Sequence, residues 1–166
     1  MSYHILDEVL QDHGPLTTWL SQPSLNSTWI PKADLPNVFR PLALNAEKLF
    51  DLSEATGYEF WTHNNTYPNW HFDKDEQAYL KGRLLFPICS MVYYAQVQSL
   101  NGGELYFQDG TRILPKANRQ VLFSPGLYHR VSAYHGTRVT MLLNPWKVKP
   151  EAVNTNEQLI KELQGL

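Results

Sequence analysis

The 166-residue chain has a single cysteine, Cys89, so no disulfide can form within it. Its formal net charge is only −2, which leaves no basic surplus of the kind that binds nucleic acid or anionic membranes. No apolar run approaches the ~18 residues of a membrane span, and no basic segment followed by an apolar stretch opens the sequence. We therefore expect a cytoplasmic protein with neither nucleic acid nor a membrane as partner.

Aromatic residues, in contrast, make up 13% of the sequence, with five Trp and nine Tyr. Large aromatic side chains favour strands and cavity walls. From Tyr58 onward, short β-rich runs alternate with turn signals such as Asn101-Gly102-Gly103 and Asp109-Gly110, which are typical of antiparallel hairpins. Several such runs in succession predict a sandwich or barrel. The expected fold class is mainly β with flanking helices.

The length is that of one domain, and three parts of it can be distinguished. A helical and irregular strap is expected over residues 1–56, a β core over 57–146 and a C-terminal helix over 151–166. Apolar spacings near three and four predict two short helical pieces within 3–20. Four prolines predict an irregular course over 21–41, and a further helix is expected over 45–53. Asn154 or Thr155 is the candidate cap of the C-terminal helix.

Three residues of the β core form a candidate metal site. His71 and Asp73 are two positions apart in a strand-like stretch, so strand alternation directs both side chains to one face. His129 lies in another strand-like stretch and supplies a second imidazole. Two histidines and one carboxylate with open positions suit a non-haem Fe(II) oxygenase. Arg138 follows on a later strand, where its guanidinium could bind a carboxylate of a cosubstrate in bidentate fashion.

Four segments that carry these residues resemble the 2-oxoglutarate and Fe(II)-dependent dioxygenases, in particular the prolyl-4-hydroxylase-like group. They are "HFDKDE", "VYYAQVQSLNGGELYF", "PKANRQVLFSPGLYHRV" and "GTRVTMLLNPW", and the resemblance spans about residues 58–146. It implies a double-stranded β-helix, or jelly roll, with iron ligands His71, Asp73 and His129. It also implies that Arg138 binds the far carboxylate of 2-oxoglutarate with Tyr94 beside it, or Tyr93 if the strand is shifted by one residue.

The implied cofactors are Fe(II), 2-oxoglutarate as cosubstrate and O2, with ascorbate as a candidate stimulant. The presence of Asp73 argues against a halogenase, because related halogenases replace this carboxylate by a small residue to make room for chloride.

The lining of the pocket follows from the same alternation. Arg138, Thr140, Leu142 and Asn144 share one strand face, so Thr140 and Asn144 are candidate substrate or supporting contacts if Arg138 points inward. Trp61 or Trp70 could wall the substrate pocket. Which face of the 58–64 strand points inward is left open. His63 and His135 are interpreted as hydrogen-bonding residues at the surface or the pocket rim.

The favoured interpretation is a hydroxylase that acts on an unactivated C–H bond of a small molecule such as an amino acid or natural product. A peptidyl, prolyl-type hydroxylase of the same class is the first alternative. The second alternative is a cupin-like protein that binds a metal or small acid without oxidation. The third is a protein of the same fold whose metal site serves as a sensor or is a regulatory remnant. A lone H-x-D pair is more often structural than metal-binding, so the prediction depends on the conjunction of that pair with His129 and Arg138.

Overall fold

A computed structural model of the chain describes residues 2–166. The strands are β1 (Tyr3–Leu6), β2 (Thr28–Pro31), β3 (Gly57–Asn64), β4 (Ser90–Gly102), β5 (Leu105–Phe107), β6 (Arg112–Ile113), β7 (Arg119–Phe123), β8 (His129–Val131) and β9 (Tyr134–Trp146). The α-helices are α1 (Gly14–Leu20), α2 (Arg40–Leu49), α3 (Glu76–Leu80) and α4 (Glu157–Gln164), with 3-10 turns at Lys32–Asp34 and Asn37–Phe39. No described helix has the length and hydrophobicity needed to cross a membrane.

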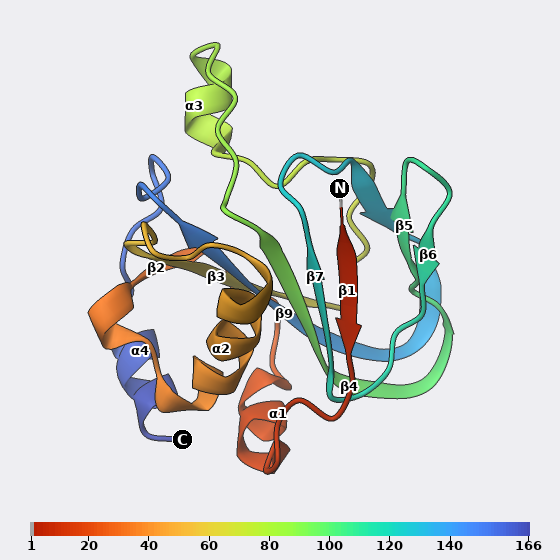
Figure 1. Cartoon of the computed structure of the whole chain (residues 1–166). Helices are drawn as coiled ribbons and strands as arrows, with labels where there is room; N and C mark the ends of the chain where they lie inside the picture. The colour runs from red at the N-terminus through yellow and green to blue at the C-terminus, as the bar shows by residue number, and fades with distance from the viewer. Residues whose placement is uncertain (1) are drawn as a thin grey trace.

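The strands form two antiparallel sheets, as the sequence predicts. The larger sheet has the order β1-β7-β4-β9-β3-β2 and the smaller one β6-β5-β8. The long strands β4 and β9 pair with each other and curve from the larger sheet toward the smaller one (Figure 1). Register shifts between Tyr94 and Gln96 and between Gln98 and Asn101 accompany this curvature, as bulges do. The result is the predicted jelly roll.

Strand alternation divides the apolar residues into two cores. Tyr93 and Met141 belong to a core between the larger sheet and the helices, whereas Tyr94 and Leu142 belong to a core between the two sheets. Helices α1, α2 and α4 lie together on the outer face of the larger sheet (Figure 1). The space between the sheets is therefore shared by this second core and the residues of the candidate site.

The N-terminal segment corrects one prediction. The first of the two expected helical pieces is strand β1, which pairs with β7 from Tyr3 opposite Phe123 to Leu6 opposite Gln120. Tyr3 packs against the core between the sheets, whereas Leu6 packs against the core beneath the helices. The unpaired edge of β7 supplies backbone hydrogen bonds that a four-residue amphipathic segment could not provide as an isolated helix. The second expected piece is α1.

The proline-rich stretch is more regular than expected. Strand β2 pairs with β3, and Pro31 stands at its last position on the sheet edge, where a missing N–H is tolerated. Helix α2 starts before the expected 45–53 because Pro41 falls in its first turn, where proline is compatible with a helix. Helix α4 is capped by Asn156, not by Asn154 or Thr155: the Asn156 side chain accepts a hydrogen bond from the Leu159 amide.

Of the two glycine turns, Asp109-Gly110 joins the paired strands β5 and β6, as predicted. The prediction of a hairpin at Asn101-Gly102-Gly103 is wrong. Strand β4 belongs to the larger sheet and β5 to the smaller one, so the glycines form the corner at which the chain changes sheets. Gly103 has φ +76°, and an added Cβ there would lie 3.0 Å from Cδ of Arg138. The corner thus places backbone directly against a candidate site residue.

Candidate metal centre and its two chambers

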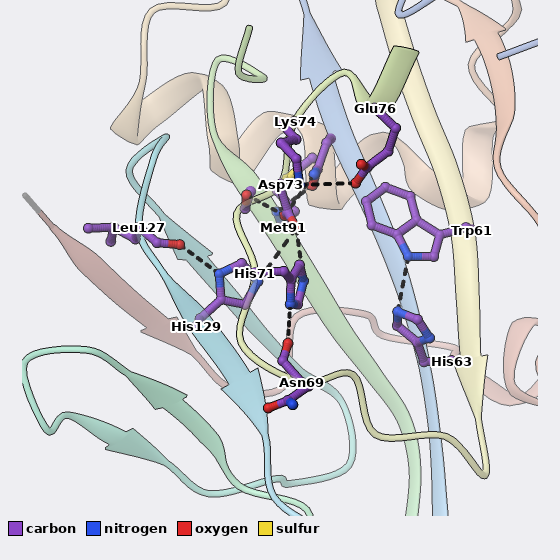
Figure 2. Close-up of polar contacts among 12 residues, drawn as sticks. Trp61, His63, Asn69, His71, Asp73, Lys74, Glu76, Met91, Leu127 and His129 are labelled. Carbon is purple, nitrogen blue, oxygen red and sulfur yellow. Dashed lines mark hydrogen bonds and ion pairs between the residues drawn. The ribbon is translucent and has the colours of Figure 1, made fainter. Parts of the chain in front are cut away.

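The side chains of His71, Asp73 and His129 converge, with one ligand atom from each lying within 4.8 Å of the others. Nε2 of His71 lies 3.4 Å and Nε2 of His129 3.5 Å from Oδ1 of Asp73 (Figure 2). The H-x-D pair is not on a regular strand, which corrects the sequence interpretation. His71 makes a single antiparallel bridge to His129, with N···O distances of 2.9 and 3.0 Å, and the chain then leaves the sheet. The bridge still brings the two imidazoles together.

Both imidazoles are oriented by hydrogen bonds to backbone carbonyls. Nδ1 of His71 lies 2.6 Å from the Asn69 carbonyl oxygen, and Nδ1 of His129 lies 2.7 Å from that of Leu127 (Figure 2). A carbonyl can only accept, so each Nδ1 must carry the proton. Nε2 of each ring is then the atom that faces Asp73, and it is the atom that would coordinate a metal.

The Asp73 carboxylate is buried and is held at one oxygen. Its Oδ2 accepts hydrogen bonds from Oγ of Ser90 at 2.6 Å and from Nδ2 of Asn144 at 3.1 Å. Oδ1 therefore remains available on the side of the imidazoles. Asn144 was a candidate supporting contact from sequence, and the structure places it in this position.

The charges of the three residues are coupled. Burial favours a raised pKa for Asp73, but hydrogen bonds and charge from His129 and His71 hold it well below its usual range. Burial favours a lowered pKa for His71, but the neighbouring Asp73 raises it above its ordinary value. The three residues therefore form a site in which a divalent cation could replace the protons between the imidazoles and the carboxylate and balance the negative charge of Asp73.

On one side of the metal-ligand cluster lies a chamber that we call the inner chamber. It is lined by His63, Pro68, His71, Val92, Leu105, His129, Val131, Arg138, Thr140 and Leu142. The Arg138 side chain is 2% exposed, donates from Nε to the Gly103 carbonyl at 3.1 Å and from Nη1 to Oγ1 of Thr140 at 3.3 Å. Arg138 forms no ion pair with any carboxylate in residues 2–166. It is a buried cation without an anionic partner.

The two adjacent tyrosines of β4 point in opposite directions. The Tyr94 ring lies beneath the Arg138 guanidinium at 5.3 Å, and its buried hydroxyl has no hydrogen-bond partner in the part of the chain that the structure describes. Tyr93 points to the helix side, where its hydroxyl donates to Oδ1 of Asn118 at 3.1 Å. Of the two tyrosines, Tyr94 is therefore the one beside Arg138, although it does not itself line the inner chamber.

A second chamber, which we call the outer chamber, also adjoins the cluster and shares His63, Pro68 and His71 with the inner one. It is lined by Ser27, Glu59, Trp61, His63, Pro68, His71, Phe72, Asp73, Lys74 and Glu76. Its volume is about 250 Å³, whereas that of the inner chamber is about 20 Å³. The inner chamber has room for about one water molecule, so a larger ligand requires its walls to move apart.

Strand β3 settles the question that the sequence left open. Glu59, Trp61 and His63 face the chambers, while Tyr58 and Phe60 face the helices. The Trp61 indole N–H donates to Nε2 of His63 at 3.2 Å (Figure 2). Burial, together with the Arg138 charge, lowers the pKa of His63 to about 4, so His63 is neutral.

The remaining candidates separate clearly. Thr140 lines the inner chamber and Trp61 the outer one. Trp70 lines neither: it is 38% exposed and stacks on Tyr128 with ring centroids 5.4 Å apart. His135 is exposed on β9. Sequence reasoning assigned no role to Glu59, although its spacing from Trp61 was the signal that both share a face.

Several solved structures resemble this one over nearly the whole chain, and three of them serve as examples. The viral collagen prolyl hydroxylase of Paramecium Bursaria Chlorella virus-1, in complex with 2-oxoglutarate, has a TM-score of 0.57 at 15% identity over 90% of this chain and 97% of its own. A prolyl hydroxylase of Trichoplax adhaerens, in complex with a hypoxia inducible factor peptide fragment, has a TM-score of 0.58 at 14% identity. The match covers 93% of this chain and 87% of that protein. An oxidoreductase of the 2OG-Fe(II) oxygenase family from Burkholderia pseudomallei has a TM-score of 0.57 at 12% identity. The match covers 93% of this chain and 88% of that protein.

These likenesses confirm the jelly-roll fold and agree with the resemblance drawn from the sequence motifs. No protein-family sequence profile and no curated protein sequence matches the chain.

Proposed function

We propose that the protein is an Fe(II)- and 2-oxoglutarate-dependent dioxygenase that hydroxylates an unactivated C–H bond of a small molecule such as an amino acid. One observation carries the proposal: two imidazoles and a carboxylate converge beside a chamber that holds a buried arginine with no ion pair in residues 2–166. The cluster supplies ligands for a metal, and the arginine supplies a partner for a dicarboxylate. Neither feature by itself would specify this class.

The donor set fits Fe(II). Two imidazoles that hold a proton at Nδ1 and present Nε2, and a carboxylate with one free oxygen, are the three ligands of a facial triad. Ser90 and Asn144 hold Asp73 so that only Oδ1 is available for the metal. This supporting layer fixes the direction of the ligands before any metal binds.

The inner chamber fits the distal carboxylate of 2-oxoglutarate. Arg138 would bind it through charge-assisted hydrogen bonds, and the Tyr94 hydroxyl, which has no hydrogen-bond partner among residues 2–166, would donate to it. Thr140 already positions the guanidinium through Nη1. When bound, the iron and 2-oxoglutarate together activate O2 and yield succinate, CO2 and a hydroxylated substrate. The chain itself contributes orientation and the exclusion of water.

A peptidyl hydroxylase of the same class is the second candidate, since the Trichoplax adhaerens relative is seen with a peptide fragment. We favour a small molecule because the outer chamber has a volume of about 250 Å³, below the 300–1,000 Å³ of most drug-sized ligand sites. A cupin-like protein without oxidative activity is the candidate from another class, and it has no need of a buried cation opposite the metal.

Succinate formation tests the proposal. The purified protein is incubated with Fe(II), ascorbate, 2-oxoglutarate and O2, and succinate is measured by mass spectrometry. We expect succinate with the native chain and with His135→Ala, whose exposed imidazole lies outside both chambers. His71→Ala and Asp73→Ala should abolish it. Absence of succinate from the native protein under all conditions, or its persistence in the two ligand variants, would overturn the assignment.

A further inference from the structure

The two chambers beside the metal-ligand cluster carry opposite charge. The inner chamber holds the Arg138 cation, whereas the outer chamber receives the Glu59 side chain from β3. One oxygen of the Glu59 carboxylate, Oε1, accepts a hydrogen bond from the Trp146 indole N–H at 3.2 Å. In residues 2–166, Glu59 makes no ion pair. A largely buried carboxylate thus faces the chamber without a cation.

Burial, with added repulsion from Asp73 and Asp75, raises the pKa of Glu59 to about 7. The carboxylate is therefore poorly compensated by the protein itself. A cation placed in the chamber would relieve both the burial and the repulsion.

Besides His63 and His71, the basic side chain that lines the outer chamber is Lys74, and it interacts with other residues. Its Nζ lies 3.3 Å from Oε1 of Glu76 and 5.1 Å from the centre of the Tyr79 ring. Figure 2 shows this contact between Lys74 and Glu76. Lys74 therefore does not neutralise Glu59, and the charge of Glu59 is left for a ligand.

The rest of the lining suits a small organic cation. Trp61 offers an indole whose N–H is tied to His63, so the ring is held in place as one wall of the chamber. Aromatic faces attract ammonium groups, and tryptophan does so most strongly. Phe72 and Pro68 add apolar surface, and the volume of about 250 Å³ is smaller than that of most drug-sized ligand sites, which favours a small ligand.

We propose that the outer chamber binds the ammonium group of a free amino acid, with Glu59 as its ionic partner and Trp61 as an aromatic wall. The inference rests on the proposed function in one respect: the amino acid is taken to be the substrate. Binding of its ammonium group would place one of its C–H bonds beside the metal. It narrows the substrate class from any small molecule to an amine-bearing one. Glu59 and Trp61 are then specificity-determining residues.

Calorimetric titration tests this without turnover. Mn(II)-loaded protein with 2-oxoglutarate, and the same protein without either, is titrated at pH 8 with L-lysine, L-arginine, L-proline and L-leucine. Each is compared with its Nα-acetyl derivative, and L-lysine also with its Nε-acetyl derivative. We expect at least one amino acid to bind, and acetylation of the recognised amine to weaken binding about tenfold or more. The two lysine derivatives distinguish an α-ammonium from a side-chain ammonium.

Glu59→Gln tests the same charge from the side of the protein, and it keeps an oxygen that can accept from Trp146. It should weaken binding about tenfold or more, whereas Glu47→Gln, at an exposed site on α2, should not. If no amino acid binds, or if acetylated and free forms bind equally, the proposal is wrong. The acetylation series decides the matter even if Glu59→Gln does not fold.

The outcome is separable from the proposed function. Charge-dependent binding without succinate formation would keep this site and reject the dioxygenase. Succinate formation, together with equal binding of free and acetylated amino acids, would support the dioxygenase and reject the ammonium site. Tighter binding of an N-acetylated proline peptide than of any free amino acid would overturn the inference in favour of a peptidyl substrate.

Discussion

Asn144 donates a hydrogen bond from Nδ2 to Oδ2 of Asp73 at 3.1 Å, while its own Oδ1 accepts from the Met91 amide at 2.9 Å. The side chain thus links the backbone of β4 to the carboxylate of the metal-ligand cluster. Asn144 is fully buried, so neither bond is replaced by solvent. The orientation of Asp73 is in this way fixed by the pairing of the two longest strands.

Replacing Asn144 by alanine should therefore weaken metal binding without removing a ligand. Loss of a supporting hydrogen bond of this kind typically costs about 10–100-fold in metal affinity. Mn(II) titration of the metal-free protein measures the change, and Asn37→Ala, at an exposed position, is the matched control. Unaltered affinity in Asn144→Ala, in a protein shown to be folded by circular dichroism, would contradict this role.

Arg138→Ala should raise the KM for 2-oxoglutarate steeply. Truncating one partner of a buried charge pair costs about 2–5 kcal/mol, or roughly 30-fold to several thousandfold in affinity. Arg138→Lys keeps the charge but loses the planar fork, so we expect an intermediate KM. Steady-state succinate formation gives both values, with Arg112→Ala at the exposed end of β6 as control. An unchanged KM in Arg138→Ala would exclude the proposed contact.

Gly103→Ala should also raise the KM for 2-oxoglutarate, through Arg138. An alanine Cβ would lie 3.0 Å from Cδ and 3.3 Å from Nε of Arg138, and the backbone has φ +76°. Gly110→Ala is a matched control, since it has φ +90° but nothing within 4 Å of the added Cβ. Both variants should lose about 1 kcal/mol or more of folding free energy because alanine is strained at positive φ.

Only Gly103→Ala should change the KM. Thermal unfolding and succinate kinetics on both variants separate backbone strain from displacement of the guanidinium. Equal KM values in the two variants would show that Arg138 accommodates the methyl group.

The residues that β9 contributes to the candidate site could be predicted from the sequence, because side chains alternate between the two faces of a strand. Arg138, Thr140 and Asn144 share a face of β9. If one of them points into the space between the sheets, the other two must do so as well. The choice between Tyr93 and Tyr94 could not be made in this way. It depends on the register of β4 against β9, where Tyr94 lies opposite Thr140 before the first register shift.

The failures have a common cause in tertiary pairing. The segment of β1 has apolar spacing that suits a helix, but the edge of β7 makes it a strand. The H-x-D pair was expected on a strand, yet β8 has three residues and gives His71 a single bridge. Trp70, one residue before His71, is consequently free to turn outward onto Tyr128. Glu59 was missed because a glutamate in an alternating strand is ordinarily solvated.

The raised pKa of Glu59 predicts a pH-dependent stability. Its pKa is about 7 in the folded chain, against an ordinary value of 4.5. Below pH 4.5 the carboxyl is protonated in the folded and unfolded states alike and imposes no penalty. Between these two values the unfolded chain ionises first, so the folded state loses stability as pH rises. Above pH 7 the loss is complete and constant, on the order of 1–3 kcal/mol.

Glu59→Gln should remove this loss. In metal-free protein we expect the variant to exceed the native chain in free energy of unfolding at pH 8 by on the order of 1–3 kcal/mol, and to match it near pH 4.5. Urea unfolding at both pH values measures the difference, with Glu47→Gln as a control that shows none. Added Mn(II) should reduce the gain, because it neutralises Asp73, one of the charges that raises the pKa of Glu59. A gain of equal size at both pH values would mean that the carboxylate is not the source of the instability.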